Sequence, residues 1–560
     1  MIKEELRKII EKAVKTDCPD FSVEITGDKN RGDYSTNVAL VLTKKLGNNS
    51  KEIAESIKQK IGENKLFKKV EIAGPGFINF FISDKYFIDN LKDIKKDFGK
   101  EEELKNKKII IDYTDPNILK EFHIGHLMSN IIGESLSRIF EFQGAKVERV
   151  CYQSDVGISV AKAVWGIINM KNDNFGKDGQ YAKFLGMSYA FGSQMYEEDE
   201  KAKEEIIALN KKIFDRSDKE VNKIYDQGKK RSLDYFDKIY KKLGTKFDDF
   251  ILESEVADLG KNIVEKGLKT GIFEKGEKGA IIFKGEKCGF HTRVFINSEG
   301  LPTYEAKDLG LAEIKYKKYK YDRSFIITGN EVNDYFKVML CAMDKVAPEL
   351  AKKTKHIGHG MLRLPEGKMS SRTGKVVTAE SLMEKVEELV LKKIKNRELS
   401  DKEKKEIVEK VAIGAIKYSI LKQSIGSDIV YDFDKSISFD GDSGPYLQYS
   451  YTRAESILKK SKEEKIKPNF KEIPNEITQL EKLMIYFSEA VLQAEKNYDP
   501  HYLTTYLTEL AGIFNGYYAK NKIVDKSDKL SPYRIALTNA FAVIMKNGLN
   551  LLGIETLEKM

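Results

Sequence analysis

The stretch from residue 107 to residue 153 constrains the fold most, because its hydrophobic pattern describes a strand, a helix and a second strand. Residues 107–114 (KKIIIDYT) form a short apolar run typical of a strand buried in a parallel sheet. From Ile124 to Phe142 apolar residues recur at helical spacing, and the dipeptide Gln-Gly that follows ends the helix. Residues 146–153 (KVERVCYQ) form the next strand. The pattern predicts a βαβ unit within a Rossmann-like parallel sheet.

The length and the changing pattern along the chain indicate several domains. A chain of 560 residues is too long for one ordinary core, so we expect two to four domains. Residues 1–100 predict a small α+β domain. Residues 101–395 alternate strands and helices, with charged amphipathic helices around 160–290 that suit an insertion. Residues 396–560 are almost purely helical. The expected fold class is multidomain α/β with an all-α C-terminal bundle.

Composition bears on location and on partners. The chain has no run of 18 or more apolar residues, and its N-terminal amphipathic helix does not look like a signal or transit peptide. Four cysteines lie far apart and fit a reduced compartment without a zinc site (Cys18, Cys151, Cys288 and Cys341). A net charge of +9 permits a polyanionic partner but does not require one. We therefore expect a cytoplasmic protein, with no membrane association and no tightly bound metal.

The tetrapeptide at residues 123–126 (HIGH) lies where a predicted strand gives way to a helix. At this edge of a parallel sheet ligands bind, and a helix N-terminus offers free N–H groups to phosphate. His123 and His126 can donate to phosphate oxygens, and Gly125 lets an adenine ring approach the backbone. Taken alone, two exposed histidines near a helix start explain the match equally well. The same letters recur at residues 356–359, but that copy opens no helix and is interpreted as a strand.

A second segment supports a nucleotide site. Residues 365–375 (PEGKMSSRTGK) predict a flexible basic loop after a strand. Its lysines and hydroxyls can close over a triphosphate and neutralise charge that develops when the α-phosphate is attacked. Alone this loop would be an ordinary solvated turn, but its pairing with HIGH within alternating α/β sequence is hard to explain otherwise. Neither GxGxxG nor GxxxxGK[ST] occurs, which argues against dinucleotide and P-loop proteins.

Together, HIGH and KMSS resemble the class I aminoacyl-tRNA synthetases, and longer segments resemble arginyl-tRNA synthetase. The resemblance covers nearly the whole chain and is weakest in the insertion. The segments that carry it are DYTDPNILKEFHIGHLMSNIIGESL, GLPTYEAKDLGLAE, LPEGKMSSRTGKVV, ISFDGDSGPYLQYSYTRAESIL and NGLNLLGIETLEKM, with GDYSTNVAL and AGPGFINFFIS near the N-terminus.

This resemblance implies the reaction and its partners. Arginine would attack the α-phosphate of ATP, which enters with Mg²⁺, to give arginyl-adenylate and pyrophosphate. The arginyl group would then pass to the 2′-hydroxyl of the terminal adenosine of tRNA(Arg). Members of this family usually need bound tRNA before they activate the amino acid, and they are usually monomers. The expected partners are therefore L-arginine, ATP and tRNA(Arg).

The resemblance also assigns residues to the ATP site. His123 and His126 would hold phosphate or ribose, and the backbone of Gly360, Met361 and Leu362 would meet adenine. Further ATP contacts are expected from Gly125, Lys368, Ser370 and Ser371. The usual motif has lysine where this chain has Ser371, so Lys120 and Lys368 are expected to share the stabilisation of phosphate.

Arginine specificity should come from carboxylates, because a guanidinium is planar, always charged and offers five donors. Asp112, Asp155 and Asp308 are candidates at predicted strand ends or turns. By resemblance, Tyr304 and Asp308 would meet the guanidinium, Asn117 would bind the amino or carboxylate end, and Asp112 replaces a glutamate common in the family. A helix N-terminal charge is the alternative for Asp308. The family's glutamine is missing from GNEVNDYF, which offers only Asn330 or Asn333.

Candidate tRNA contacts lie at both ends of the chain. In the C-terminal region Tyr446 and Tyr449 stand near Arg453, and aromatic rings beside a cation suit unstacked loop bases. Without the resemblance, core tyrosines at helical spacing would be favoured. Phe77 and Asn79 match positions that contact the tRNA elbow in this family, but both could equally belong to a strand.

Three other functions compete with this interpretation. A class I synthetase for another amino acid is the nearest, although the cysteine enzyme would need a cysteine-rich zinc set. A small nucleotidyltransferase would need neither the helical C-terminal region nor the N-terminal domain. A non-catalytic tRNA-binding paralogue should have lost HIGH or KMSS, and both are largely intact.

Overall fold

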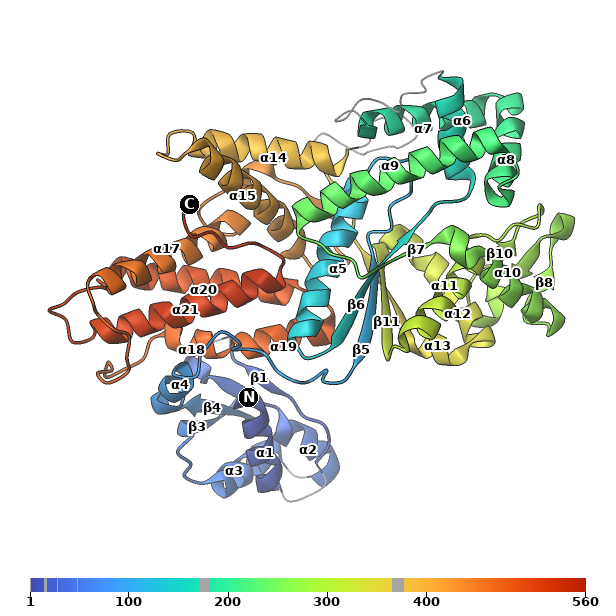
Figure 1. Cartoon of the computed structure of the whole chain (residues 1–560). Coiled ribbons are helices and arrows are strands. Elements are labelled where there is room, and N and C mark those ends of the chain that lie inside the picture. Colours follow the sequence, from blue (N-terminus) through green and yellow to red (C-terminus); the bar gives the residue numbers. More distant parts are fainter. Residues whose placement is uncertain (1, 15–17, 28, 48, 171–180, 365–376) are drawn as a thin grey trace. The chain divides into compact units, whose positions relative to one another are not determined.

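The computed structural model describes residues 2–14, 18–27, 29–47, 49–170, 181–364 and 377–560. These residues form two compact units, each built from segments distant in sequence (Figure 1). The first unit combines the chain up to Gly99 with residues 453–491 and 509–547. The second contains residues 100–452, 492–508 and 548–560. The helical C-terminal region is therefore divided between the two units.

A five-stranded parallel sheet forms the centre of the second unit, in the order β12-β11-β5-β6-β7. Its strands are β5 (Lys108–Tyr113), β6 (Lys146–Gln153), β7 (Asp249–Leu252), β11 (Arg323–Gly329) and β12 (Thr354–His359). Helix α5 (Ile124–Phe142) connects β5 to β6, which confirms the predicted βαβ unit. Gly133 allows α5 to pack tightly on β5, because a side chain there would collide with the Tyr113 ring. The strand order reverses between β5 and β11, and ligands bind beyond the carboxyl ends at such a point.

The predicted insertion is mainly helical. Between β6 and β7 it contains α6 (Ile158–Asn169), α7 (Tyr181–Glu198), α8 (Glu200–Asp215) and α9 (Lys219–Leu243). After β7 come α10 (Glu253–Lys269) and a small antiparallel sheet, of which the sequence pattern indicated only the last strand. Its strands are β8 (Glu274–Lys275), β9 (Ile281–Phe283) and β10 (Arg293–Ile296). Helices α11 (Tyr304–Tyr319), α12 (Asn333–Val346) and α13 (Pro348–Lys353) then complete the α/β part.

The chain after residue 376 is almost entirely helical, which includes the region from residue 396 onward that was predicted to be so. Its helices are α14 (Ala379–Ile394), α15 (Asp401–Leu421), α16 (Phe433–Ser436), α17 (Gly444–Glu463), α18 (Gln479–Ile485), α19 (Phe487–Asn497), α20 (His501–Lys520) and α21 (Ser531–Leu551). One short strand, β14 (Ile429–Val430), pairs in parallel with β13 (Leu362–Arg363), which follows the central sheet.

The first unit contains a four-stranded antiparallel sheet in the order β1-β2-β4-β3. Its strands are β1 (Val23–Ile25), β2 (Tyr34–Thr36), β3 (Phe67–Ala73) and β4 (Phe77–Ile82), and its helices are α1 (Ile2–Val14), α2 (Val38–Leu46), α3 (Ser50–Ile61) and α4 (Asp84–Leu91). Buried polar contacts join this sheet to C-terminal helices. Tyr34 donates to Glu489, and Lys482 pairs with Asp33 at 2.7 Å. Because buried polar groups need partners, these contacts fix the two segments together.

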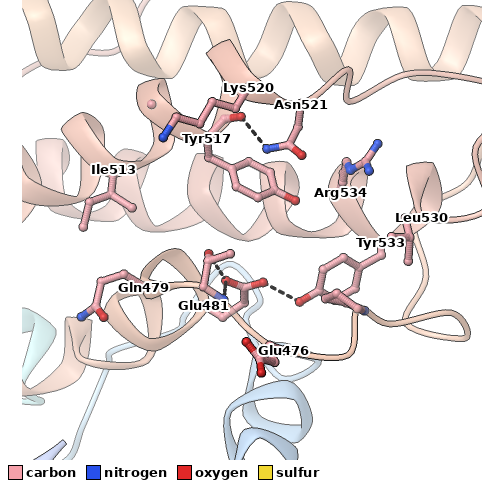
Figure 2. A pocket seen from close by; sticks show the side chains of 13 residues that line it. Glu476, Gln479, Glu481, Ile513, Tyr517, Lys520, Asn521, Leu530, Tyr533 and Arg534 are labelled. Atoms are coloured by element: carbon pink, nitrogen blue, oxygen red, sulfur yellow. Dashed lines mark hydrogen bonds between the residues drawn. The ribbon is translucent and has the colours of Figure 1, made fainter. Parts of the chain in front are cut away.

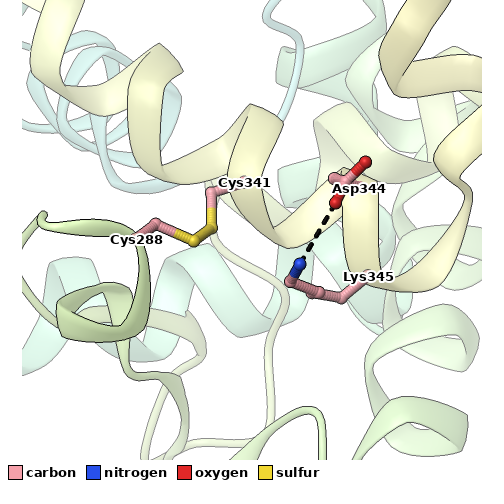
Figure 3. The surroundings of a disulfide bond; sticks show 4 residues. All are labelled: Cys288, Cys341, Asp344 and Lys345. Carbon is pink, nitrogen blue, oxygen red and sulfur yellow. Dashed lines mark hydrogen bonds and ion pairs between the residues drawn. A yellow bond between two sulfur atoms is a disulfide. The ribbon is translucent and has the colours of Figure 1, made fainter.

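A disulfide between Cys288 and Cys341 joins the short helix Gly285–Cys288 to α12, with the two Cα atoms 6.7 Å apart (Figure 3). The expectation that all four cysteines are reduced is therefore wrong for this pair. The two residues are 53 positions apart, and only packing of α12 against the insertion brings them together. Cys151 is a buried thiol. Among the described helices, none has the length and apolar character needed to cross a membrane.

Candidate active site

The loop between β5 and α5 has an unusual backbone. Thr114, Asp115 and Leu119 all have positive φ angles, of 83°, 45° and 59°. Such conformations are costly for residues other than glycine and persist only where surrounding contacts hold them. The amide of Thr114 donates to Ser129 Oγ at 2.9 Å, and that of Leu119 donates to Ser232 Oγ at 3.0 Å. The loop is thus held in one shape at the carboxyl end of the central strand.

The two HIGH histidines cap the N-terminus of α5. His123 Nδ1 accepts from the amides of Gly125 and His126, at 3.1 and 3.3 Å. His126 Nδ1 accepts in return from the amide of His123 at 3.3 Å, so each ring satisfies backbone donors that the helix leaves open. The two rings stack with their centroids 3.5 Å apart. The sequence predicted a helix start here, and the histidines themselves form the cap.

These contacts determine the chemistry of both rings. Burial lowers the pKa of His123 to about 4, with Lys120 acting in the same direction. Burial also lowers the pKa of His126 well below its ordinary value, helped by His123 and Lys120. A neutral imidazole whose Nδ1 accepts must carry its proton on Nε2. Both histidines are therefore neutral and have an Nε2–H that can donate to an anion.

The chain returns to HIGH directly after the basic loop. Thr378 forms an antiparallel bridge with His123, the amide of Ile124 donates to Val377 O at 3.3 Å, and that of Ala379 donates to Phe122 O at 2.8 Å. Lys368, Ser370 and Ser371 lie outside the described residues. Among the described residues, Val377 to Ala379 contact the backbone of Phe122 to Ile124.

Lys120, which precedes HIGH, lies over the ring of Tyr189 on α7, with Nζ 4.0 Å from the centroid. Burial acts to raise the pKa of Tyr189, but the charge and hydrogen bond of Lys120 lower it overall. Beside it, burial raises the pKa of Glu121 to about 7, with the charge of Glu380 adding to the effect. The predicted auxiliary lysine thus lies close to the two histidines in sequence and contacts α7 through Tyr189.

The second HIGH copy forms β12, as interpreted from the sequence. His356 Nε2 contacts Thr328 Oγ1 at 2.7 Å, and its ring stacks on Phe336. Gly360 follows the strand with its backbone so close to Ser427 that no side chain would fit. Met361 is 39% exposed, whereas Leu362 is buried. The three residues proposed to meet adenine therefore continue from the carboxyl end of the edge strand.

Carboxylates gather near the carboxyl end of β5 and the start of α11, where Asp112 is buried and Asp308 is half-buried. Asp112 accepts from Lys315 Nζ at 2.9 Å, and its other oxygen is buried without a hydrogen-bond partner among the described residues. Asp308 accepts from the hydroxyl of Tyr335 at 2.6 Å. Burial raises the pKa of Asp308 to about 7 despite this hydrogen bond, with Glu253 and Asp112 adding to the rise. The cluster therefore favours a cation that would keep Asp308 ionised.

Two more carboxylates extend this cluster. Glu253, the first residue of α10, pairs with Lys307, and burial raises the pKa of Glu253. Asp115 accepts from the amide of Tyr152 at 2.9 Å, and burial together with Asp112 raises the pKa of Asp115. Four carboxylates thus share two ammonium groups, which leaves a formal excess of two negative charges. The members are Asp112, Asp115, Glu253 and Asp308, with Lys307 and Lys315.

The other predicted arginine contacts differ in their surroundings. Asp155 is fully buried and accepts from Tyr225 and Lys229 of α9 and from Ser254 of α10. These donors occupy both of its oxygens. Tyr304 begins α11 and is 49% exposed, with Lys307 Nζ 4.4 Å from its ring centroid.

Asn117 lies opposite Ser154 in an isolated parallel bridge beyond β5 and β6, and it is half-buried. Asn333 Oδ1 lies against Gly358. A side chain at position 358 would collide with it in this arrangement. Sequence reasoning missed Glu253, Tyr335 and Lys315. Tyr335 lies within the segment GNEVNDYF that was searched for an amide, so its position was the nearest available signal.

The predicted tRNA contacts also differ from one another. Tyr446 and Tyr449 are half-buried on α17. Arg453, further along this helix, donates to Asn515 and lies over the Tyr518 ring at 5.2 Å. At the start of β4, Phe77 is 38% exposed, whereas Asn79 is 4% exposed in the middle of the antiparallel sheet.

The parallel sheet and its capped helix at the switch point are the parts of a class I aminoacyl-tRNA synthetase catalytic domain, and the comparison with family models shows that class. A family model described as tRNA synthetases class I (R), catalytic domain, matches residues 89–433. Models of an arginyl-tRNA synthetase N-terminal domain and of a DALR anticodon-binding domain match residues 1–82 and 447–560.

Comparison with individual proteins specifies the family. The arginine–tRNA ligase of Fusobacterium nucleatum is 33% identical over 99% of both chains. That of Clostridium acetobutylicum is 31% identical over 100% of this chain and 99% of the relative. The arginyl-tRNA synthetase of Thermus thermophilus has the same fold over 100% of both chains, with a TM-score of 0.81 at 22% identity. The chain belongs to the arginyl-tRNA synthetase family.

Proposed function

We propose that this protein attaches L-arginine to tRNA(Arg) in two steps, using ATP and releasing AMP and pyrophosphate. The observation that carries the proposal is the pair of neutral, Nε2-protonated histidines at the switch point of the sheet, with a buried acidic cluster in the same unit. One feature suits a triphosphate and the other suits a guanidinium.

In the first step a carboxylate oxygen of arginine attacks the α-phosphorus of ATP. A new carboxyl–phosphorus bond forms, the bond to the β-phosphate oxygen breaks, and pyrophosphate leaves. His123 and His126 donate Nε2–H to phosphate oxygens, while Lys120 and Lys368 offset the added negative charge. Because the rings are neutral and held by the backbone, their donors need no reorganisation during the reaction. Gly125, Ser370 and Ser371 complete the phosphate contacts, and Gly360 to Leu362 hold adenine.

In the second step the 2′-hydroxyl of the terminal adenosine attacks the acyl carbon of the adenylate. The new ester forms, AMP leaves, and the hydroxyl proton is released. Orientation of the two reactants is the main requirement of this step. Tyr446, Tyr449 and Arg453 are proposed to hold the anticodon end of the tRNA, and Phe77 with Asn79 its elbow. The exposed ring of Phe77 supports its role directly, whereas Asn79 would need its buried amide uncovered.

Arginine specificity is proposed to come from the acidic cluster. Asp308 and Tyr304 would meet the guanidinium, Asp112 would add its unpaired oxygen, and Asn117 would bind the amino acid end. The raised pKa of Asp308 supports this, because a guanidinium would supply the counter-charge that ionisation of this carboxyl needs. Asp155 would contribute by holding α9 and α10, since protein donors already occupy its oxygens.

We further propose that ATP enters as its Mg²⁺ complex, that no metal is tightly bound, and that the protein is a cytoplasmic monomer. Among the described residues, no group of three or more histidine, cysteine or acidic side chains is arranged to hold a metal ion.

Aminoacylation of total tRNA with each amino acid in turn tests the specificity. Charging by arginine alone is expected, and charging by another amino acid would favour the alternative class I assignment. Pyrophosphate exchange with and without tRNA tests the first step. No exchange under either condition, with tRNA still bound, would instead favour the non-catalytic tRNA-binding alternative.

A further inference from the structure

A cavity of about 440 Å³ lies between three helical segments of the first unit (Figure 2). Its walls are the approach to α18, the last turns of α20 and the first turn of α21. Its size falls in the range of pockets that bind small molecules. The predicted catalytic and tRNA-binding residues do not line it.

One side of the cavity is held rigidly. Tyr533 donates to Glu481 at 2.7 Å, and Glu481 also accepts from Thr478 in the capping box of α18. In Figure 2 the ring of Tyr517 projects from α20 toward this Glu481–Tyr533 pair. Tyr517 is half-buried and lines the cavity, so the exposed part of its ring can contact a planar ligand there.

Gly516 keeps the cavity open. It lies inside α20, where glycine is less favourable than alanine. A side chain built on it would meet nothing within 4 Å, so no neighbouring group requires a glycine at this position. The missing side chain leaves open space beside Tyr517, and a larger residue could fill that space without displacing the helix.

The polar groups around the cavity suit a nucleotide. Gln479 contributes an amide, and Asn521, which donates to Tyr517 O at 2.9 Å, has a carbonyl oxygen that can accept. Lys520 is exposed, while Arg534 pairs with Asp528. The charged residues that line the cavity are Glu476, Glu481, Lys520 and Arg534, and of the two cations the exposed Lys520 is placed to meet a phosphate.

The cavity lies on a different face of α20 from Arg453. That arginine contacts Asn515 and Tyr518, whereas the cavity is lined by Gly516, Tyr517 and their neighbours one turn away. Residues two apart on a helix point about 200° apart around its axis. The bundle therefore offers two separate surfaces on one helix.

We propose that this cavity binds one unstacked nucleotide of the tRNA, with its base stacked on Tyr517, its edge at the amides of Gln479 and Asn521, and its phosphate near Lys520. The inference rests on the proposed function, which supplies a tRNA as the partner. Rings, amides and cations at one place suit bases of single-stranded loops. The cavity also lies within residues 447–560, which match the anticodon-binding domain model.

Filling the cavity tests the proposal in the full-length protein. Gly516→Leu should raise the Kd for an unmodified tRNA(Arg) transcript about tenfold, the loss expected for one stacked base. Ala519→Leu is the matched control, because it adds the same side chain to an exposed position of the same helix outside the cavity. Tyr517→Leu should weaken binding like Gly516→Leu, whereas Tyr517→Phe keeps the ring and should retain most of the affinity.

Probing the tRNA by 2′-hydroxyl acylation, at saturating protein, identifies the nucleotide. One loop nucleotide protected by the unchanged protein should become reactive with Gly516→Leu and stay protected with Ala519→Leu. Unchanged reactivity, together with Kd values within about twofold of each other, would overturn the proposal. Equal losses in Gly516→Leu and Ala519→Leu would also overturn it, since filling the cavity would not be the cause. If tRNA binding responds as expected but no arginine is attached, the proposed function fails while the cavity assignment stands.

Discussion

The raised pKa of Asp308 leads to a pH dependence of arginine binding. The carboxyl has a pKa of about 7 without ligand, because it is buried near Glu253 and Asp112. A bound guanidinium favours the carboxylate and so lowers this pKa. Affinity is therefore fully present above about pH 7 and is lost as the pH falls below it. The ionised fraction is about 90% at pH 8 and about 10% at pH 6, so the Kd should rise about tenfold between them.

Calorimetric titration of the protein with L-arginine at pH 6, 7 and 8 measures this effect. Asp308→Asn should weaken binding at pH 8 by about 10- to 150-fold, as expected for a hydrogen bond to a charged group, and should remove the pH dependence. Asp258→Asn, an exposed acid on α10, is the control and should behave like the unchanged protein. A Kd that stays constant between pH 6 and 8 in the unchanged protein would refute the reasoning.

Three further outcomes follow from the contacts. Tyr335→Phe removes the hydrogen bond that lowers the pKa of Asp308, so the midpoint of the pH-dependent arginine affinity should move upward, measured by the same titration. His126→Ala should reduce tRNA-dependent pyrophosphate exchange by about 10²- to 10³-fold, as for loss of one transition-state donor, while the Kd for tRNA changes little; retained exchange would place the site elsewhere. Burial lowers the pKa of Lys417 to about 7, so the unfolded chain binds more protons and this group makes stability rise with pH above 7. Lys417→Met should reduce the rise in the denaturant midpoint between pH 7 and 9, and an unchanged slope would contradict this assignment.

Local features of the chain could be predicted from the sequence alone. The spacing of apolar residues predicted the strand and the helix around HIGH. Side-chain direction repeats every two residues in a strand and about every 3.6 residues in a helix, so a short segment is enough to show either pattern. The different secondary structures of the two HIGH copies were also predictable, since only the first copy precedes an apolar pattern with helical spacing. The carboxylates Asp112 and Asp308 were identified as candidates because they lie at predicted strand or helix ends.

Ion pairs between residues far apart in the sequence could not be predicted in this way. Lys315 reaches Asp112 across 203 positions, and Lys307 reaches Glu253 across 54. Such pairs depend on the strand order and on how α10 and α11 pack, which periodicity does not encode. The same reason explains why the disulfide and the antiparallel pairing of β8, β9 and β10 were missed.

The sequence by itself determined the class of chemistry, because the capped helix and the basic loop are each contiguous segments whose residue types suit phosphate. Only the tertiary structure decided how charge is distributed in the acidic cluster and which protons the histidines carry. Burial and hydrogen-bond partners set both properties, and both arise when segments far apart in the chain pack together. The sequence alone suggested that Asp155 could bind the substrate. In the structure, donors from α9 and α10 already occupy both of its carboxylate oxygens.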